Sequence, residues 1–189
     1  METIETIKSR FTARKYTSES VDAQDLKQIV EAGLHAPSST NRQRWKLTVV
    51  TNPELLHQLE VETMDALGKL PDRERFYKSM QRRGGTVFYG CTAIVYVFHE
   101  SGTTGRDLDS SARDTGILVE NMALAATSLG YGNCINGLAE SIFQLERNEF
   151  WRETLQVPDG YEFGIALLIG KTDAEPTPHK INPEKVTWM

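Results

Sequence analysis

The sequence predicts a layered domain of the α/β class, in which helices cover a sheet of apolar strands. Segments with helical spacing of apolar residues alternate along the chain with short apolar runs. Residues 91–98 (CTAIVYVF) are continuously apolar, which predicts a strand covered on both faces. Residues 108–129 form the longest helical pattern. Its second half, MALAATSLG, is small and apolar almost all round, as in a helix buried in a core or a subunit interface.

The first half of the chain carries clear local signals. A short helix is expected over residues 2–10, and a second helix after Asp22, a residue type that caps helices. Residues 36–45 (APSSTNRQRW) are expected to form a loop that leads into a strand, WKLTVVT. Asn52–Pro53 then predicts a helix start, because a capping residue is followed by proline at the first helical position.

The second half is less regular. Residues 68–86 are charged and aromatic without a clear period, so we expect either a helix or a mobile excursion. Residues 130–137 (GYGNCING) are expected to form a tight connection from helix to strand. A helix from about Ser141 to Leu155 and a strand, FGIALLIGK, follow. The whole chain, residues 1–189, is predicted to be one domain, with residues 171–189 as an extended tail that lies on another surface.

Composition excludes several classes of protein. The formal net charge of −5 argues against nucleic acid as the main partner, because binding to phosphates needs a positive surface. No apolar run approaches the roughly 20 residues of a membrane-spanning helix, and the start METIETIKSR does not resemble a signal peptide. We therefore expect a cytoplasmic protein that does not bind membranes. The two cysteines and four histidines are scattered, so neither a disulfide framework nor a metal site is expected.

The basic segment, Ser9–Tyr16 (SRFTARKY), is the first candidate site. Arg10 and Arg14 flank Thr12, which places two guanidinium groups and a hydroxyl within five residues. A phosphate monoester is bound well by such a set of charged and neutral donors. The alternative is a solvated basic cluster at the end of a helix, where it complements the helix dipole. On this segment alone, the solvated cluster is the better interpretation.

Two later segments are also ambiguous when each is taken alone. The polar loop, Pro37–Gln43, is rich in small donors and acceptors, so it either lines a polar ligand or forms an ordinary turn. The glycines of residues 130–137 fail the GxGxxG pattern, because Ile135 stands at the third glycine position. The sequence also contains no GxxxxGK[ST] and no GxSxG motif. Dinucleotide-binding, P-loop and serine-hydrolase interpretations therefore lose their main support.

The order of the motifs is more specific than any one of them. A [KR]-x-[ST]-x-[KR]-x-[FY] segment is followed by A-P-S-S-x-N-x-Q-x-W. Then come D-x-G-x-x-x-x-N-M-x-x-A-A-x-x-L-G, from Asp114 to Gly130, and a closing L-I-G-K. Over essentially the whole chain, this order resembles the nitroreductase family, and in particular its shorter members. The resemblance implies an α+β three-layer sandwich, whose central mixed, mainly antiparallel sheet is flanked by helices. It also implies an interlocked homodimer that holds two FMN molecules at the subunit interface.

The resemblance assigns roles to the basic segment. Arg10 matches the family's phosphate-binding base, and Thr12 lies near the phosphate and ribityl chain, with Phe11 in the same cofactor-binding set. Arg14 falls where the family places a cation facing the N1–C2=O edge of the flavin. Two-electron reduction leaves negative charge on that edge, so a fixed cation there stabilises the reduced state.

Other cofactor contacts are implied further along the chain. The polar loop is expected to reach the flavin of the partner subunit, and the residues after the long helix to offer backbone donors to N5. Lys180 is the candidate for a second phosphate contact. The residues concerned are Pro37, Ser38, Ser39, Asn41, Ile135, Asn136, Gly137 and Lys180. Two departures stand out: Arg44 replaces the family's proline before Trp45, and no clear match exists around Gln81–Gly85 for a mid-chain Asn/Lys pair.

The implied activity is ping-pong hydride transfer from NADH or NADPH, through flavin N5, to a small acceptor such as a nitroaromatic or a quinone. Such chemistry needs no side-chain nucleophile or general acid, and the sequence shows no catalytic triad. The alternatives on the same scaffold are a flavin reductase, a dehalogenase, another dehydrogenase, or a flavin-binding protein without turnover. A nucleic-acid-binding module is disfavoured by the net charge.

Overall fold

The computed structural model describes residues 2–101, 106–177 and 180–189, and of residues 106–109 it describes the backbone alone. Ten helices and strands are assigned in this part of the chain. In chain order they are α1 (Thr3–Ser9), α2 (Ala23–Leu34), β1 (Trp45–Val50), α3 (Pro53–Lys69), α4 (Glu74–Arg82), β2 (Ala93–Glu100), α5 (Arg106–Ser128), β3 (Gly132–Asn136), α6 (Asn148–Thr154) and β4 (Tyr161–Gly170). Short 3-10 turns accompany them: η1 (Ser39–Asn41), η2 (Pro71–Arg73), η3 (Leu138–Phe143) and η4 (Pro183–Lys185).

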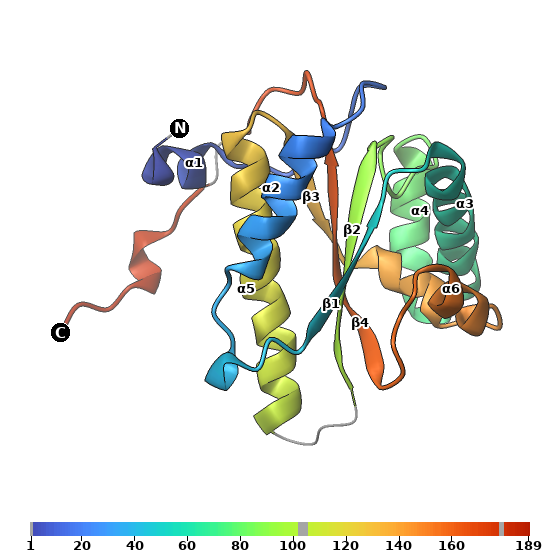
Figure 1. The fold of residues 1–189 in the computed structure, drawn as a ribbon. Helices are drawn as coiled ribbons and strands as arrows, with labels where there is room; N and C mark the ends of the chain where they lie inside the picture. The colour runs from blue at the N-terminus through green and yellow to red at the C-terminus, as the bar shows by residue number, and fades with distance from the viewer. Residues whose placement is uncertain (1, 102–105, 178–179) are drawn as a thin grey trace.

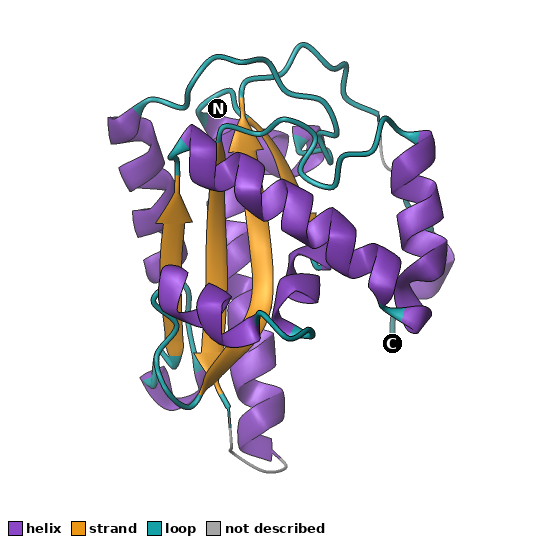
Figure 2. Ribbon diagram, turned by 90° about the vertical axis from the view of Figure 1, so that its right-hand side faces the viewer, coloured by secondary structure: helices purple, strands orange, loops and turns teal. Residues whose placement is uncertain are grey.

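The four strands form one sheet in the order β1-β2-β4-β3, and each neighbouring pair is antiparallel. An isolated parallel bridge between Thr12 and Asn133 adds the N-terminal segment to β3. Helices α2 and α5 cover one face of the sheet, and α3, α4 and α6 lie on the other (Figure 1). Figure 2 shows the sheet from the side of α3. The predicted three-layer α+β arrangement with a mainly antiparallel sheet is therefore confirmed.

Strand β2 is an inner strand of the sheet, and its side chains belong to the hydrophobic clusters on both faces. Ile94, Tyr96 and Phe98 pack in the cluster beneath α3 and α6, whereas Val95 and Val97 pack against α2 and α5. All five are fully buried, which confirms a strand covered on both faces. This alternation follows from the strand period of two, because successive side chains point to opposite faces.

The predicted helix starts are confirmed by their caps. The Asp22 carboxylate accepts hydrogen bonds from the amides of Gln24 at 2.7 Å and Asp25 at 3.1 Å. Asn52 caps α3 by accepting from the amide of Leu55 at 2.9 Å. Side-chain oxygens at these positions satisfy amides that have no partner inside the helix. For residues 68–86 the helical alternative is correct, because α3 extends to Lys69 and α4 follows η2.

Two local predictions are wrong. The segment 130–137 is more than a connection, since Gly132–Asn136 forms edge strand β3, paired with β4 from Gly132↔Gly170 to Asn136↔Ala166. The predicted helix from Ser141 to Leu155 is divided into η3 and α6. The first turn begins before Ser141 because the Asn136 Oδ1 atom accepts from the amides of Leu138 at 2.8 Å and Ala139 at 3.2 Å.

Both ends of the described chain expose apolar side chains. After β4 the chain forms no further strand or long helix among residues 171–177 and 180–189, and it runs away from the sheet past α5 (Figure 1). Trp188 is 90% exposed there, and Ile181 is 84% exposed. Ile4 and Ile7 on α1 are also exposed. Within the described residues, no helix is both long enough and apolar enough to cross a membrane.

Candidate functional site

The basic segment lies against the start of β3. Thr12 bridges to Asn133, and the amide of Ala13 donates to the carbonyl of Asn133 at 2.9 Å. Gly132 permits this approach, because a Cβ atom at that position would lie 2.9 Å from the Cβ of Ala13 and closer still to Thr172. Two motifs that are ambiguous in the sequence, the basic segment and the glycine-containing segment 130–137, therefore meet in one place.

Beyond Thr12, the outer edge of β3 pairs with no strand in the part of the chain that the structure describes. The carbonyl of Asn133 faces that edge, since it accepts from Ala13. Main-chain groups alternate in direction along a strand, so the N–H and C=O of Ile135 face the same open edge. The side chain of Ile135 is exposed as well. The backbone of Ile135 is therefore placed to bind a ligand beside the basic segment.

The two arginines of the segment differ in environment. Arg10 is mostly buried, with its Nε atom 3.7 Å from a carboxylate oxygen of Glu120 on α5. Arg14 is exposed and lies close enough to Tyr89, in the loop between α4 and β2, for its charge to lower the pKa of that phenol. Phe11 is partly buried and packs on the core beneath α3.

Buried thiol and phenol groups lie behind these arginines. Burial raises the pKa of the Cys134 thiol to about 11, although Arg14 and Arg10 both lower it. Burial also raises the pKa of Tyr89 and of Tyr16. The Tyr16 hydroxyl is buried and has no hydrogen-bond partner among the described residues. Tyr16 closes the motif that contains the two arginines, whereas Tyr89 and Cys134 were not found from the sequence, because nothing in their spacing links them to Arg10 or Arg14.

Gly137 is exposed and lines a hollow of about 440 Å³ at the end of β3. Phe76 on α4 and Phe163 on β4 contribute aromatic surface to this hollow. Arg73 lines it too, paired with Glu140 at 3.0 Å. The segment 68–86 therefore contributes to the space beside the residues expected near flavin N5.

The polar loop is held at the other end of α5. Both carboxylate oxygens of Asp114 accept from the amide of Ser39, at 3.2 and 3.1 Å, and Asp114 itself is buried. The Ser38 hydroxyl accepts from the amide of Gln43 at 3.0 Å. Three non-glycine residues of the loop have positive φ: Thr40, Asn41 and Gln43. Pro37 and Asn41 are exposed.

Within this chain the polar loop does not meet the basic segment. Asp114, which holds the loop, and Glu120, which pairs with Arg10, are six residues apart and thus about 9 Å apart along α5. Figure 1 shows η1 and α1 near opposite ends of α5. Lys180 is exposed. Thus the structure joins Arg10, Thr12, Arg14 and the end of β3, and it holds the polar loop apart from them.

The two departures from the family pattern lie in different parts of the structure. Arg44, which replaces the proline, forms an ion pair with Glu100 at 3.2 Å across the edge of the sheet. Arg83 lies close enough to Tyr89 for its charge to lower the pKa of that phenol. Arg83, but not Arg44, therefore belongs to the surroundings of Arg14.

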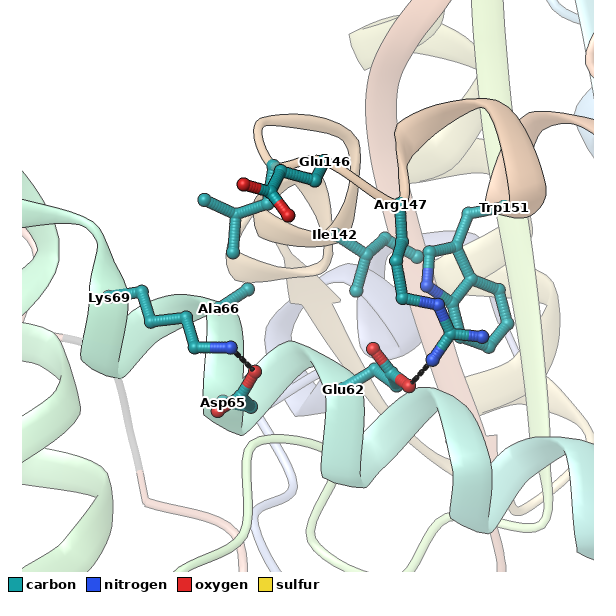
Figure 3. A pocket seen from close by; sticks show the side chains of 9 residues that line it. Glu62, Asp65, Ala66, Lys69, Ile142, Glu146, Arg147 and Trp151 are labelled. Carbon is teal, nitrogen blue, oxygen red and sulfur yellow. Dashed lines mark hydrogen bonds and ion pairs between the residues drawn. The ribbon is translucent and has the colours of Figure 1, made fainter.

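Another cavity, of about 310 Å³, lies between α3 and the segment from η3 to α6 (Figure 3). Ala66, Ile142 and Trp151 form its apolar wall. On its rim Lys69 pairs with Asp65, and Arg147 pairs with Glu62. None of the expected site residues lines this cavity, so it is separate from the site on β3.

An antiparallel α+β sandwich with a basic segment on its edge strand defines the class of the protein, and comparison with known proteins names the family. The model of the Nitroreductase family matches residues 7–171, and the chain belongs to this family.

Solved structures and curated proteins agree with this assignment. A nitroreductase with bound FMN from Desulfitobacterium hafniense DCB-2 is 33% identical, with a TM-score of 0.91, over 100% of this chain and 99% of that chain. A nitroreductase with bound FMN from Bacteroides fragilis is 27% identical, with a TM-score of 0.86 over the same shares. The NADPH-flavin oxidoreductase of Vibrio harveyi is 26% identical over 92% of this chain and 67% of that protein.

Proposed function

We propose that this protein is an FMN-dependent NAD(P)H oxidoreductase that passes hydride to a small acceptor. The observation that carries the proposal is the meeting of the basic segment with the open edge of β3, in a nitroreductase fold. The similar structures from D. hafniense and B. fragilis bind FMN, which supports the same cofactor here. We also propose one domain over residues 1–189, with residues 171–189 as its tail, and a cytoplasmic location.

The donors on β3 and the basic segment fit the chemistry of FMN. Arg10 and Thr12 supply a charged and a neutral donor for a phosphate, and Arg14 supplies a cation for the N1–C2=O edge. The N–H of Ile135, on the open edge of β3, supplies a donor for the N5 side, while its carbonyl accepts from the Cys134 thiol at 3.7 Å. FMN held by these residues would supply the hydride-transfer chemistry between NAD(P)H and the acceptor.

The hollow beside Gly137 supports the proposal that the acceptors are small aromatic molecules. Phe76 and Phe163 offer aromatic surfaces on which nitroaromatics and quinones stack. Because the reductant and the acceptor would use the same place in turn, we propose ping-pong turnover. The side chains bind and orient the substrates, and no side-chain nucleophile is required.

We further propose a homodimer in which each flavin contacts both subunits. The polar loop is held away from Arg10 of its own chain, so a second copy is needed to bring such a loop to the phosphate site. The exposed Ile4 and Ile7 on α1 and the exposed Ile181 and Trp188 in the tail are apolar surface for a partner to cover. Lys180 would supply a second contact to the phosphate.

The absorption spectrum of the purified protein tests the cofactor and the activity together. We expect a flavin spectrum that is bleached by NADH or NADPH without oxygen and restored by a quinone or a nitroaromatic. A colourless protein that takes up no added FMN would exclude the proposal. A yellow protein that NAD(P)H does not bleach would instead indicate a flavin-binding protein without turnover.

A flavin reductase is the second candidate, and the name of the V. harveyi relative favours it. In that case added free FMN or FAD is reduced at steady state and leaves the protein. Turnover measured with free flavin and, separately, with a quinone distinguishes the two activities. Faster reduction of free flavin would favour the second candidate.

A further inference from the structure

The cavity between α3 and the segment from η3 to α6 combines an apolar wall with a charged rim (Figure 3). On α3, Glu62, Asp65 and Lys69 follow one another at intervals of three and four residues, so they lie on one face of the helix. Ala66 lines the cavity from the same face, and its small side chain leaves the space open. Side chains from residues 142–151 line the opposite side. A ligand in this cavity would bind apart from the flavin.

Trp151 supplies the cavity with a hydrogen-bond donor that the rest of the protein does not use. Trp151 is 1% exposed and lines the cavity, and its indole nitrogen lies on the edge of the ring toward Ile142 (Figure 3). Among the described residues this N–H has no hydrogen-bond partner. A buried indole N–H usually has an acceptor. The acceptor for Trp151 must therefore come from whatever enters the cavity.

The indole ring is fixed in this orientation by its neighbours. Phe150 packs edge-on against it, with the ring centroids 5.0 Å apart. The guanidinium of Arg147 lies over the ring, 5.7 Å from its centroid, and is also paired with Glu62 on α3. Trp151 belongs to the hydrophobic cluster beneath α3 and α6 as well. The N–H cannot turn toward another acceptor without the loss of these contacts.

The rim of the cavity carries one more carboxylate than it has cations. Lys69 pairs with Asp65 at 2.6 Å, and Arg147 pairs with Glu62. Glu146 also lines the cavity and is exposed, and it forms no ion pair or hydrogen bond within the part of the chain that the structure describes. The negative charge of Glu146 is therefore not balanced locally. It favours a cationic ligand and disfavours an anionic one.

We propose that this cavity binds a small amphiphilic amine, which carries a protonated amino group, an apolar or aromatic body and an oxygen acceptor. The amino group pairs with Glu146, and the oxygen accepts from the N–H of Trp151. The body lies against Ala66 and Ile142, which are apolar. A volume of about 310 Å³ is at the lower end of the range for ligand pockets, so the ligand is small. The site uses none of the residues assigned to FMN and does not depend on the proposed function.

Tyramine is the probe, because it joins a protonated amine, one aromatic ring and a hydroxyl. The indole N–H signals in ¹⁵N NMR spectra of the purified protein report its binding, since the chain has three tryptophans. Trp45→Phe and Trp188→Phe each remove one signal, so the third is assigned to Trp151 without a change to the cavity. We expect millimolar tyramine to shift the signal of Trp151 and to leave that of Trp188 in place.

Two relatives of tyramine separate its contacts. Phenethylamine lacks the hydroxyl and should bind about fivefold more weakly, the scale of one hydrogen bond. 4-Ethylphenol lacks the amine and should bind about threefold more weakly, the scale of an exposed ion pair. Glu146→Gln should weaken the binding of tyramine to the level of 4-ethylphenol and leave the binding of 4-ethylphenol unchanged. Glu149→Gln is the matched control, because it removes an exposed carboxylate of α6 that does not line the cavity.

Ala66→Leu fills the cavity and should weaken the binding of tyramine at least tenfold. Glu146 is exposed, so the result of Glu146→Gln stands even where Ala66→Leu does not fold.

Two results would overturn the proposal. One is a Trp151 signal that tyramine leaves unchanged, even if the flavin spectrum shows that the amine binds there. The other is an equal loss of affinity in Glu146→Gln and Glu149→Gln, which would indicate a general attraction of cations to an acidic protein. A chain that takes up no FMN but binds tyramine at Trp151 would support this site and contradict the proposed function alone.

Discussion

The basic segment and the polar loop are both rich in small and charged polar residues, yet the fold holds them in different ways. The basic segment is tied to the sheet through its backbone, by the bond from Ala13 to Asn133 and by the one from the Thr172 hydroxyl to the carbonyl of Lys15. Ala13 is fully buried. The polar loop depends instead on one buried carboxylate, that of Asp114, and on turns within the loop.

This difference shows which side chains determine the backbone conformation and which are available for binding. Because backbone bonds hold the basic segment on the strand, replacement of Arg14 should change the surface more than the fold, whereas replacement of Arg10 also removes its ion pair with Glu120. The polar loop has three non-glycine residues at positive φ, and each of these conformations costs free energy. Its shape should therefore depend strongly on Asp114.

The largest effect is expected from Arg10→Ala. FMN affinity should fall by about 1.5–3 kcal/mol, the scale of hydrogen bonds to a charged group, while the backbone of the basic segment stays in place. Titration of the apoprotein with FMN, followed by flavin fluorescence, measures this loss. Lys8→Ala is the matched control, because it removes the same charge from an exposed position in the last turn of α1. Retention of full FMN affinity in Arg10→Ala would contradict the phosphate assignment.

A smaller effect is expected from Asp114→Ala. It leaves the amide of Ser39 without its acceptor, so the unfolding free energy should fall by about 1–2 kcal/mol. Asp114→Asn retains one carbonyl acceptor and should cost less. Urea unfolding of the apoprotein measures both changes. Equal stability of Asp114→Ala and wild type would show that the loop is held by its own turns.

The same two variants test whether the regions belong to different subunits of one site. Mixed dimers that contain one Arg10→Ala chain and one Asp114→Ala chain should retain one intact FMN site, if the loop acts on the partner's flavin. Differently tagged, co-expressed chains provide such dimers for a flavin count. No FMN in the mixed dimer would place both residues in a site within one chain.

The sequence predicted those parts of the fold that depend on local signals. The caps at Asp22 and Asn52 and the apolar run of β2 act within a few residues, so their patterns are visible without the fold. Strand β3 was missed because glycine and asparagine disfavour strands. Its strand state depends on pairing with β4 and on Asn133, whose Nδ2 atom donates to the Ala123 carbonyl at 3.1 Å.

The candidate site also combines residues that are close in the sequence with contacts between residues that are far apart in it. Arg10, Thr12 and Arg14 lie in one short segment, so their chemistry could be interpreted from the sequence. Arg14 lowers the pKa of Tyr89, which lies 75 residues further along the chain, and Glu60 accepts hydrogen bonds from a loop 26 to 28 residues after it. Such long-range relations arise from packing, and no spacing rule in a single sequence reports them.

The smallest expected effect is a difference between the two regions in how the unfolding free energy depends on pH. Burial raises the pKa of Cys134 on β3 from 9.0 to about 11. Since the folded-state value is the higher one, the unfolded chain releases this proton first as the pH rises above 9. The stability linked to Cys134 is therefore complete below pH 9 and is lost as the pH rises toward 11. Between about pH 9 and 10 the loss is about 1 kcal/mol.

Replacement of Cys134 by alanine should therefore flatten the decline of the unfolding free energy over this interval by about 1 kcal/mol. Ser38→Ala in the polar loop is the contrasting variant, because it removes the acceptor of the Gln43 amide and no titrating group. Its curve should run parallel to that of the wild type. Urea unfolding at about pH 8, 9 and 10 measures all three proteins. A Cys134→Ala curve that stays parallel to the wild type would mean that the thiol does not titrate differently in the folded protein, and that burial behind Arg14 does not suppress its ionisation.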